Sequence, residues 1–173
     1  MNQSLDNQTV SHVVVPGTFD PITLGHMDVI MRARHLFPHV TVAVAASAGK
    51  NGVGTIFSRS ERVSMVREAL DAAGGEDVDV KPFSGLLVDF CREVGAGGVV
   101  KGLRAMTDFE YELQQAGLNN RLAPEIESIF VMSSPNYGYV SSSIVRELAS
   151  LGADVSFLVP QNVADRLREH FRI

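Results

Sequence analysis

Residues 12–26 of the chain read HVVVPGTFDPITLGH. The β-branched run at 12–15 predicts a buried strand of a parallel sheet, and Pro16-Gly17 marks the turn that ends it. From Met27 apolar side chains recur at helical spacing as far as Pro38, which predicts a helix. A long loop thus joins a buried strand to a helix, and this is the opening unit of an α/β sheet.

The same order of strand, loop and helix continues along the chain. Further strands are predicted at 40–46, 78–83, 98–100 and 126–132. Helices are predicted from the capping box Ser58–Glu61 to Gly74-Gly75 and at 86–94. A third helix is predicted after the capping box Thr107–Glu110, with Phe109, Leu113 and Ala116 on one face. Two more are predicted, one carrying Ile144, Leu148 and Leu151 and one starting after Pro160. This pattern predicts a single-domain α/β fold over 11–173: a Rossmann-like open sheet of about five parallel strands with helices on both faces. The polar residues 1–10 are expected to form a flexible tail.

Composition excludes several classes of protein. Hydrophobic residues make up 45% and charged residues 20%, which argues against disordered, collagen-like and low-complexity chains. The formal net charge of −5 argues against a general nucleic-acid-binding surface. The longest apolar stretch, 40–46, is too short to span a membrane, and 1–10 lack the features of a signal peptide. We expect a cytoplasmic protein without nucleic-acid or membrane partners, whose single cysteine, Cys91, is a buried, reduced thiol.

Several familiar site motifs are absent from the sequence. It contains no GxxxxGK[ST], GxGxxG or GxSxG, which argues against P-loop NTPases, ordinary dinucleotide dehydrogenases and α/β-hydrolases. Without HExxH, and with one cysteine and five scattered histidines, no zinc ligand set is evident, and no metal-ligating residues are predicted. Because ligands of parallel sheets bind at the carboxyl ends of the strands, the loops there become the candidates.

The first of these loops, 16–26, has the features of a phosphate site. Gly17 and Gly25 allow a ligand to approach the backbone closely. His26 falls in the first helical turn, where free N–H groups and the positive end of the helix dipole favour anions. A histidine that only caps the helix is the alternative interpretation.

Three loops together carry a family resemblance. GTFDP at 17–21 with TLGH at 23–26 resembles the signature of the nucleotidyltransferase superfamily related to class I aminoacyl-tRNA synthetases, whose motif is [HT]xGH. KGLRAMTDFEYE at 101–112 and YVSSS at 139–143 follow in the family's order. The combination is similar to the bacterial phosphopantetheine adenylyltransferases, and the resemblance extends from Val13 to the C-terminus.

The resemblance implies a reaction of coenzyme A biosynthesis. The adenylyl group of ATP would pass to 4′-phosphopantetheine, giving dephospho-coenzyme A and pyrophosphate, with Mg²⁺ bound to the ATP phosphates. Such an in-line displacement needs no protein base, because the attacking phosphate, with a second pKa of about 6, is already largely ionised. The resemblance also implies a homo-oligomer, expected to be a hexamer, and feedback binding of coenzyme A at the same site.

The catalytic roles implied by the resemblance fall on His26, Lys50 and Arg104. His26 would stabilise the transition state on the ATP phosphates, and Lys50 would reach the attacking phosphate. Arg104 suits phosphate oxygens. From the residues alone, Lys50 could equally be a solvated loop lysine and Arg104 a surface residue.

The remaining implied ligands surround the two substrates. ATP would be bound by Thr18, Phe19, His26, Gly102, Leu103, Arg104, Glu112, Tyr137, Gly138, Tyr139, Val140, Ser141, Ser142 and Ser143, and the acceptor by Thr18, Lys50, Leu87 and Lys101. Lys101 replaces the arginine of many relatives, which keeps the charge and loses the bidentate fork. Gly138 replaces a small polar residue of many relatives, so only its backbone is expected to make contact. Leu87 could instead belong to the core, Glu112 to a solvated helix face, and one serine of 141–143 to a simple N-cap.

Two other functions stay open. The chain could be another nucleotidyltransferase of the superfamily, acting on nicotinamide mononucleotide or a phosphorylated alcohol, but the pattern at 101–112 favours the pantetheine enzyme. It could also be a nucleotide-sensing module without catalysis. The presence of His26, Lys50, Arg104 and the serine run argues against a sensor, which needs no charge stabilisers around the α-phosphate.

Overall fold

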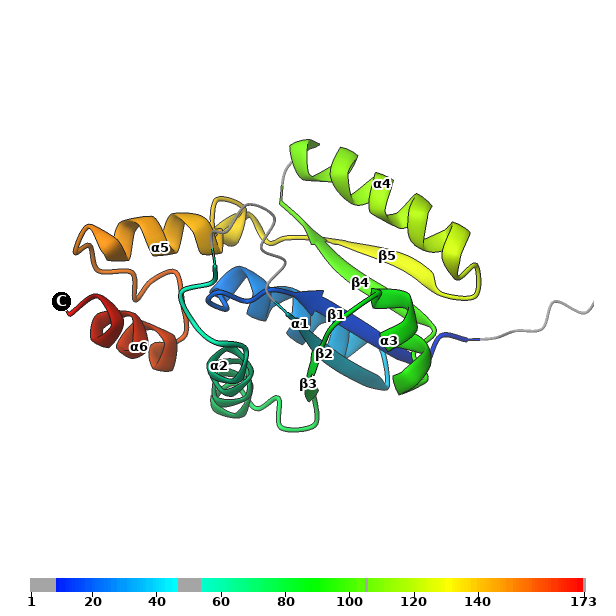
Figure 1. Ribbon diagram of the computed structural model, residues 1–173, viewed down its shortest axis with the longest axis horizontal. Helices are drawn as coiled ribbons and strands as arrows, with labels where there is room; N and C mark the ends of the chain where they lie inside the picture. Colours follow the sequence, from blue (N-terminus) through cyan, green and yellow to red (C-terminus); the bar gives the residue numbers. More distant parts are fainter. Residues whose placement is uncertain (1–8, 47–53, 105, 173) are drawn as a thin grey trace, which may run out of the picture.

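The computed structural model describes residues 9–46, 54–104 and 106–172. Five parallel strands form one sheet in the order β3-β2-β1-β4-β5 (Figure 1). They are β1 (His12–Gly17), β2 (His39–Ala45), β3 (Asp79–Phe83), β4 (Gly98–Leu103) and β5 (Glu127–Met132). The predicted open parallel sheet is confirmed. Its order changes direction between β1 and β4, the kind of switch point at which α/β sheets bind ligands.

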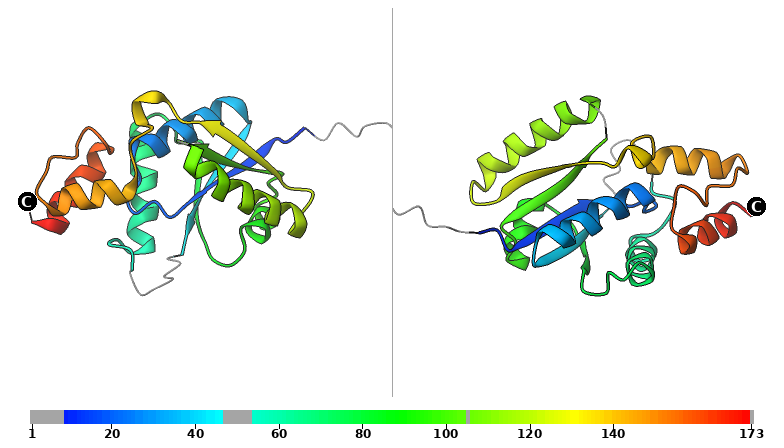
Figure 2. Two further views of the ribbon diagram at one scale, coloured as in Figure 1. Left: turned by 90° about the horizontal axis from the view of Figure 1, so that it is seen from above. Right: turned by 180° about the vertical axis from the view of Figure 1, so that it is seen from behind.

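Helices cover both faces of the sheet, as predicted. They are α1 (Leu24–Leu36), α2 (Arg59–Ala72), α3 (Leu87–Val94), α4 (Met106–Leu122), α5 (Ser142–Ser150) and α6 (Gln161–Phe171), with a short 3-10 helix η1 at Pro135–Tyr137. One hydrophobic cluster joins alternate strand residues to α1, α2, α5 and α6, and a second joins the opposite residues to α3 and the turn before β5. Figures 1 and 2 show α1 and α3 on opposite faces of the sheet.

Local signals place the ends of several elements. Ser58 and Glu61 form the predicted reciprocal capping box at the start of α2. Pro160 stands at the N-cap of α6. The single cysteine, Cys91, is a buried free thiol as expected, and burial raises its pKa to about 11. Most of the predicted tail at 1–10 lies outside the described residues, while Val10 packs against the main cluster.

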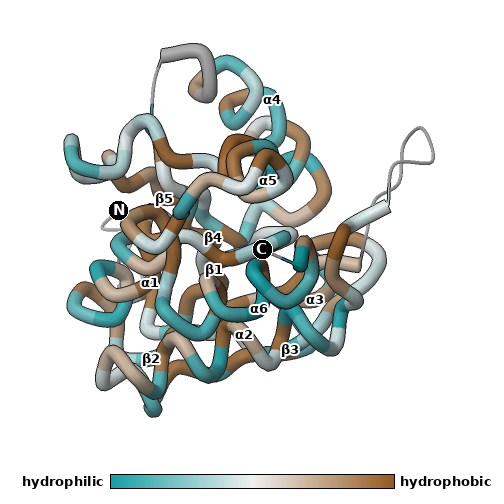
Figure 3. Tube along the Cα trace, turned by 90° about the vertical axis from the view of Figure 1, so that its left-hand side faces the viewer, coloured by the Kyte–Doolittle hydropathy of each residue, from teal (hydrophilic) through white to brown (hydrophobic). Residues whose placement is uncertain are grey.

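The connection between β4 and α4 differs from the prediction. β4 runs on to Leu103, three residues beyond the predicted strand, and α4 begins at Met106, before the predicted N-cap Thr107. The apolar face predicted for this helix is not buried, since Phe109 is 38% and Leu113 54% exposed. The helix lies over the edge of the sheet at β4 and β5 (Figure 1), and its tube alternates between hydrophilic and hydrophobic residues (Figure 3).

The helix predicted through Ile144, Leu148 and Leu151 is α5, and its buried side chains are other ones. Val145 and Ala149 are fully buried, whereas Leu151 is 78% exposed and Ile144 lies at the surface. Leu148 packs only partly against the core. Leu151 lies past the last turn of the helix, at its C-cap. Among the described residues, no helix combines the length and apolarity that a membrane span requires.

Close packing fixes the distance between α1 and β4. A β-carbon added at Gly102 would lie only 2.6 Å from Cγ2 of Val29. We therefore expect Gly102→Ala to destabilise the fold by about 1–3 kcal/mol, because the β-branched valine cannot rotate away cheaply. Urea unfolding measures this change.

The matched control is Gly117→Ala in α4, where a β-carbon meets no atom within 4 Å outside its own helical turn. That variant should gain up to about 1 kcal/mol from helix propensity. Equal effects of the two substitutions would contradict the packing constraint at Gly102.

Candidate functional site

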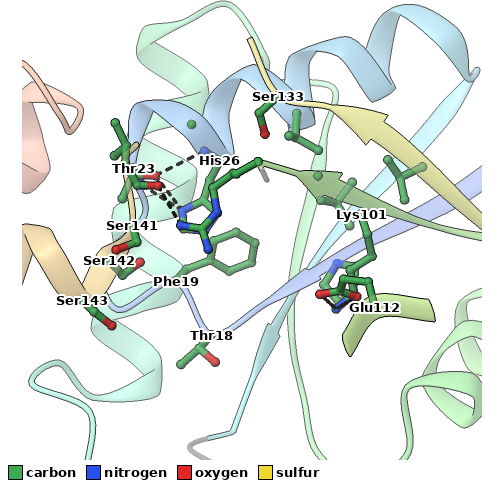
Figure 4. A pocket seen from close by; sticks show the side chains of 18 residues that line it. Thr18, Phe19, Thr23, His26, Lys101, Glu112, Ser133, Ser141, Ser142 and Ser143 are labelled. Carbon is green, nitrogen blue, oxygen red and sulfur yellow. Dashed lines mark hydrogen bonds and ion pairs between the residues drawn. The ribbon is translucent and has the colours of Figure 1, made fainter. Parts of the chain in front are cut away.

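A cavity of about 360 Å³ lies at the carboxyl ends of β1 and β4. The loop after β1, the first turn of α1, the end of β4 and the start of α5 form its walls (Figure 4). They belong to the three segments, 16–26, 101–112 and 139–143, that were predicted to form the site. Eleven of the predicted site residues line the cavity: Thr18, Phe19, His26, Lys101, Gly102, Arg104, Glu112, Val140, Ser141, Ser142 and Ser143.

An unusual backbone conformation places Phe19 in the cavity wall. Phe19 has a φ of 51°, and its ring is buried at 3% exposure. A β-carbon at Gly17 would come within 2.8 Å of that ring, so Gly17 is needed for the packing of Phe19. The ring meets the imidazole of His26 edge to face, with 5.1 Å between centroids. Gly17 therefore has a packing role in addition to any close approach of a ligand.

His26 is held in one orientation by Thr23. Thr23 is the N-cap of α1, and the two residues form a capping box. The backbone N–H of Thr23 donates to Nδ1 of His26 at 3.0 Å. Because Nδ1 accepts this bond, the proton of the neutral ring is on Nε2, which is left as a donor for a ligand. Burial, with a smaller effect from the positive charge of Arg104, lowers the pKa of His26 to about 4.

Lys101 and Glu112 form an ion pair on the other side of the cavity (Figure 4). Nζ of Lys101 lies 3.1 Å from Oε2 of Glu112, and the Glu112 side chain is only 17% exposed. Glu112 is therefore not part of a fully solvated helix face. Arg104, just past β4, donates to the carbonyl of Val140 at 3.0 Å, which connects β4 to the segment before α5.

The three serines at the start of α5 have different partners. Oγ of Ser141 accepts from the N–H of Ile144 at 3.2 Å and is the N-cap. Oγ of Ser142 donates to the carbonyl of Pro21 at 2.8 Å, which ties α5 to the first loop. Oγ of Ser143 lies 3.4 Å from a terminal nitrogen of Arg146. The first turn also presents backbone N–H groups without partners in the helix, which suits an anion.

Five of the predicted site residues that the structure describes do not line this cavity. Leu87 packs against the second hydrophobic cluster, consistent with the core alternative, and Leu103 is buried. Tyr137 ends η1, and its Cβ is 3.5 Å from the position of a β-carbon added at Gly25. A β-carbon added at Gly138 would lie 3.9 Å from the carbonyl oxygen of Arg104. Tyr139 is 68% exposed. Lys50 lies outside the described residues, so its role stays a prediction.

Sequence reasoning missed several residues around the site. Ser133 lines the cavity directly after β5, and a polar residue at the end of a strand was a usable signal. Val29 of α1 also lines it. Arg62 of α2 is fully buried, and its guanidinium donates to the carbonyls of Thr18, Ala45 and Phe57. No sequence motif marks Arg62, because two of the carbonyls it binds, those of Thr18 and Ala45, are 44 and 17 residues away in the chain.

The donors in the cavity suit a phosphorylated ligand. Lys101, Arg104, a neutral His26 and the start of α5 all present N–H groups, while Glu112 is the one carboxylate that lines the cavity among the described residues. Within the same part of the chain, no group of three or more His, Cys, Asp or Glu side chains could hold a metal ion. The site can therefore stabilise negative charge through hydrogen bonds and cationic side chains.

Comparisons with known proteins agree with this arrangement. Residues 14–148 match the family described as cytidylyltransferase-like. The phosphopantetheine adenylyltransferase of Rhodospirillum rubrum is 47% identical over 160 residues, which cover 91% of each chain. That of Nitrosomonas eutropha is 50% identical over 157 residues, covering 91% of this chain and 93% of its own.

Solved structures share the fold at low identity. A bifunctional NMN adenylyltransferase/ADP ribose pyrophosphatase from Francisella tularensis has a TM-score of 0.73 at 17% identity, with 95% of this chain and 51% of that chain covered. A putative nicotinate-nucleotide adenylyltransferase from Vibrio parahaemolyticus has a TM-score of 0.68 at 15% identity, with 95% and 98% covered. At these identities the likeness supports the fold alone.

The lowered pKa of His26 makes a prediction about acid stability. Below pH 6.5 the unfolded chain binds a proton at His26 that the folded chain binds only near pH 4, so stability is lost as the pH falls through this window. His26→Gln removes this loss. Between pH 7.5 and 5.0, wild type should therefore lose more stability than the variant, by at most about 2 kcal/mol.

Urea unfolding of both proteins at the two pH values measures the difference, and titrations shared by both chains cancel. Parallel pH dependence in the two proteins would show that His26 is not kept neutral by its surroundings.

Proposed function

Because this chain belongs to the phosphopantetheine adenylyltransferase family, we propose that ATP and 4′-phosphopantetheine react in the cavity between β1, β4 and α5. The enzyme transfers the adenylyl group of ATP to 4′-phosphopantetheine and releases pyrophosphate, forming dephospho-coenzyme A in coenzyme A biosynthesis. One observation carries the assignment of the site: His26, Lys101, Arg104 and the start of α5 converge on this cavity.

The chemistry needs positioning more than proton transfer. A phosphate oxygen of 4′-phosphopantetheine attacks the α-phosphorus of ATP, and the bond from that phosphorus to pyrophosphate breaks. The attacking group is already ionised near neutral pH, so no side chain has to remove a proton. The neutral His26 donates through Nε2 to the phosphoryl oxygens, where charge grows in the transition state. Arg104 and the first turn of α5 receive the remaining phosphates.

The acceptor is proposed to lie on the side of Lys101. Glu112 holds the ammonium group of Lys101 at 3.1 Å, which fixes the charge at the cavity wall. Lys101 then receives the acceptor phosphate as a point charge. Thr18, which lines the cavity from the first loop, lies between the two substrates in this arrangement. Lys50 and Leu87 are proposed to contact the attacking phosphate and the pantetheine arm.

Magnesium is proposed to enter with the ATP phosphates. Glu112, the carboxylate lining the cavity, is engaged by Lys101, so the described residues offer no protein cage for the ion. Mg²⁺ commonly keeps several waters and binds through substrate phosphates, which fits such a site. When bound, it would neutralise part of the charge on the triphosphate.

Assembly and regulation follow from the same proposal. A homo-oligomer, expected to be a hexamer, is supported by the large apolar side chains that α4 leaves more than half exposed: Tyr111, Leu113, Leu118 and Leu122. Coenzyme A contains the phosphopantetheine part of the product, so it should compete for the same cavity. The cytoplasm, where ATP is available, is the proposed compartment.

A panel of acceptors tests the proposed function. The purified chain is incubated with ATP, Mg²⁺ and either 4′-phosphopantetheine, nicotinamide mononucleotide or glycerol 3-phosphate, while pyrophosphate release and the nucleotide product are measured. Of the three acceptors, we expect only 4′-phosphopantetheine to be turned over. Faster turnover of another acceptor would overturn the substrate, and ATP binding without any turnover would identify a sensor.

His26→Ala tests the assigned catalytic role. We expect kcat to fall by about 10²–10³, as for the loss of one preorganised donor, with a smaller change in ATP affinity. The free energy of unfolding should fall by about 1 kcal/mol at most, because the Thr23 N–H loses its acceptor at the helix start.

Measuring kcat, the ATP dissociation constant and Tm on one preparation separates catalysis from capping. A kcat within about threefold of wild type, with a large loss of stability, would assign His26 to capping alone.

A further inference from the structure

Asp20 is a buried carboxylate that the proposed mechanism does not use. It lies in the loop after β1, two residues beyond Thr18, and is 4% exposed. Its two carboxylate oxygens accept from backbone amides at the end of another loop: Oδ2 from Ile56 at 3.0 Å and Oδ1 from Phe57 at 3.1 Å. These residues lead directly into α2, which begins at Arg59. Asp20 thus connects the first loop to the chain entering α2.

The same residue also holds α5. A terminal nitrogen of Arg146 lies 3.7 Å from Oδ2 of Asp20 and donates to the Asp20 backbone carbonyl. The other terminal nitrogen of Arg146 contacts Oγ of Ser143 at 3.4 Å, at the edge of the cavity. Ser142 adds a bond to the carbonyl of Pro21 at 2.8 Å. The start of α5 is therefore positioned by contacts to Asp20 and its neighbour.

A buried cation, Arg62, also lies close to Asp20. Burial lowers the pKa of Arg62, and the charge of Asp20 opposes this change. Arg62 donates to the carbonyls of Thr18 and Phe57, and so spans the two loops that Asp20 also joins. A buried cation without a nearby negative charge is costly, so Asp20 supports Arg62 as well as binding Arg146.

We propose that Asp20 is a positioning residue that keeps the first loop, the chain entering α2 and the start of α5 in register around the bound nucleotide. It does not line the cavity, and it acts through Thr18 and Ser143, which do. Small displacements of groups around a reacting phosphate reduce the rate strongly, so the carboxylate affects turnover as well as folding. This inference rests on the proposed function, since it assigns the anchored loops to ATP.

Asp20→Asn tests the proposal at constant volume. Asparagine keeps one acceptor oxygen but loses the charge and one of the two amide bonds. We expect the ATP dissociation constant to rise by about fivefold or more and kcat to fall by about tenfold or more. The control is Thr41→Val, which removes a fully buried hydroxyl on β2, bonded to His12 at 2.8 Å and not part of the cavity wall. It should lower Tm while kcat and ATP affinity stay within about twofold of wild type.

Arg146 provides a second route should Asp20→Asn fail to fold. Arg146→Gln should raise the KM for ATP by about fivefold and leave that for 4′-phosphopantetheine within about twofold, because α5 holds only the nucleotide. Arg146→Lys restores the charge beside Asp20 and should recover most of the ATP affinity. A merely structural role would lower Tm in both variants and leave the ratio of the two KM values unchanged.

Direct binding of ATP with Mg²⁺ separates this proposal from the proposed function. If wild type transfers adenylyl groups to another acceptor, the proposed substrate fails, yet weaker ATP binding by the Asp20 and Arg146 variants still supports the positioning role. If folded Asp20→Asn or Arg146→Gln binds ATP as wild type does, the positioning role is overturned.

Discussion

The buried guanidinium of Arg62 connects three parts of the chain that are far apart in sequence. It donates to carbonyls after β1, at the end of β2 and just before α2. Parallel strands bond along their lengths, but the loops at their carboxyl ends have no common ladder. A planar, rigid group with five N–H donors is suited to gather several carbonyls at once. The shape of the cavity depends on this cross-connection, because the loop after β1 carries Thr18 and Phe19 and leads into α1, where His26 lies.

The framework of the fold could be predicted because its signals are local. β-branched runs marked the buried strands, and the Ser58–Glu61 capping box marked the start of α2. Sequence patterns were insufficient where tertiary contacts decide which side chains of a helix are buried. The apolar residues of α4 gave a helical stripe, yet this helix lies at the edge of the sheet, where little covers it. In α5, packing against the main cluster buries Val145 and Ala149, while Leu151 is exposed.

Much of the site could be predicted because motif residues sit on loops that parallel strands bring to one edge. His26 follows the loop after β1, Lys101 lies near the end of β4 and Ser141 caps α5, and all three line one cavity. The supporting residues could not be found in this way. Asp20 stood inside a quoted motif, but its partners Ile56 and Arg146 follow 36 and 126 residues later. The division among the serines, with one capping and one bound to Pro21, likewise requires the packed structure.

The bond from Arg104 to the carbonyl of Val140 has a consequence for conformational entropy. A free arginine side chain has about 2 kcal/mol of rotamer entropy to lose when it is immobilised. Here part of that loss occurs on folding, since the guanidinium is restrained before any ligand arrives. The entropy lost on folding lowers the free energy of unfolding slightly, but it reduces the entropy that Arg104 has to lose when a ligand binds. A nucleotide that enters the cavity therefore contacts a cation whose motion is already restricted.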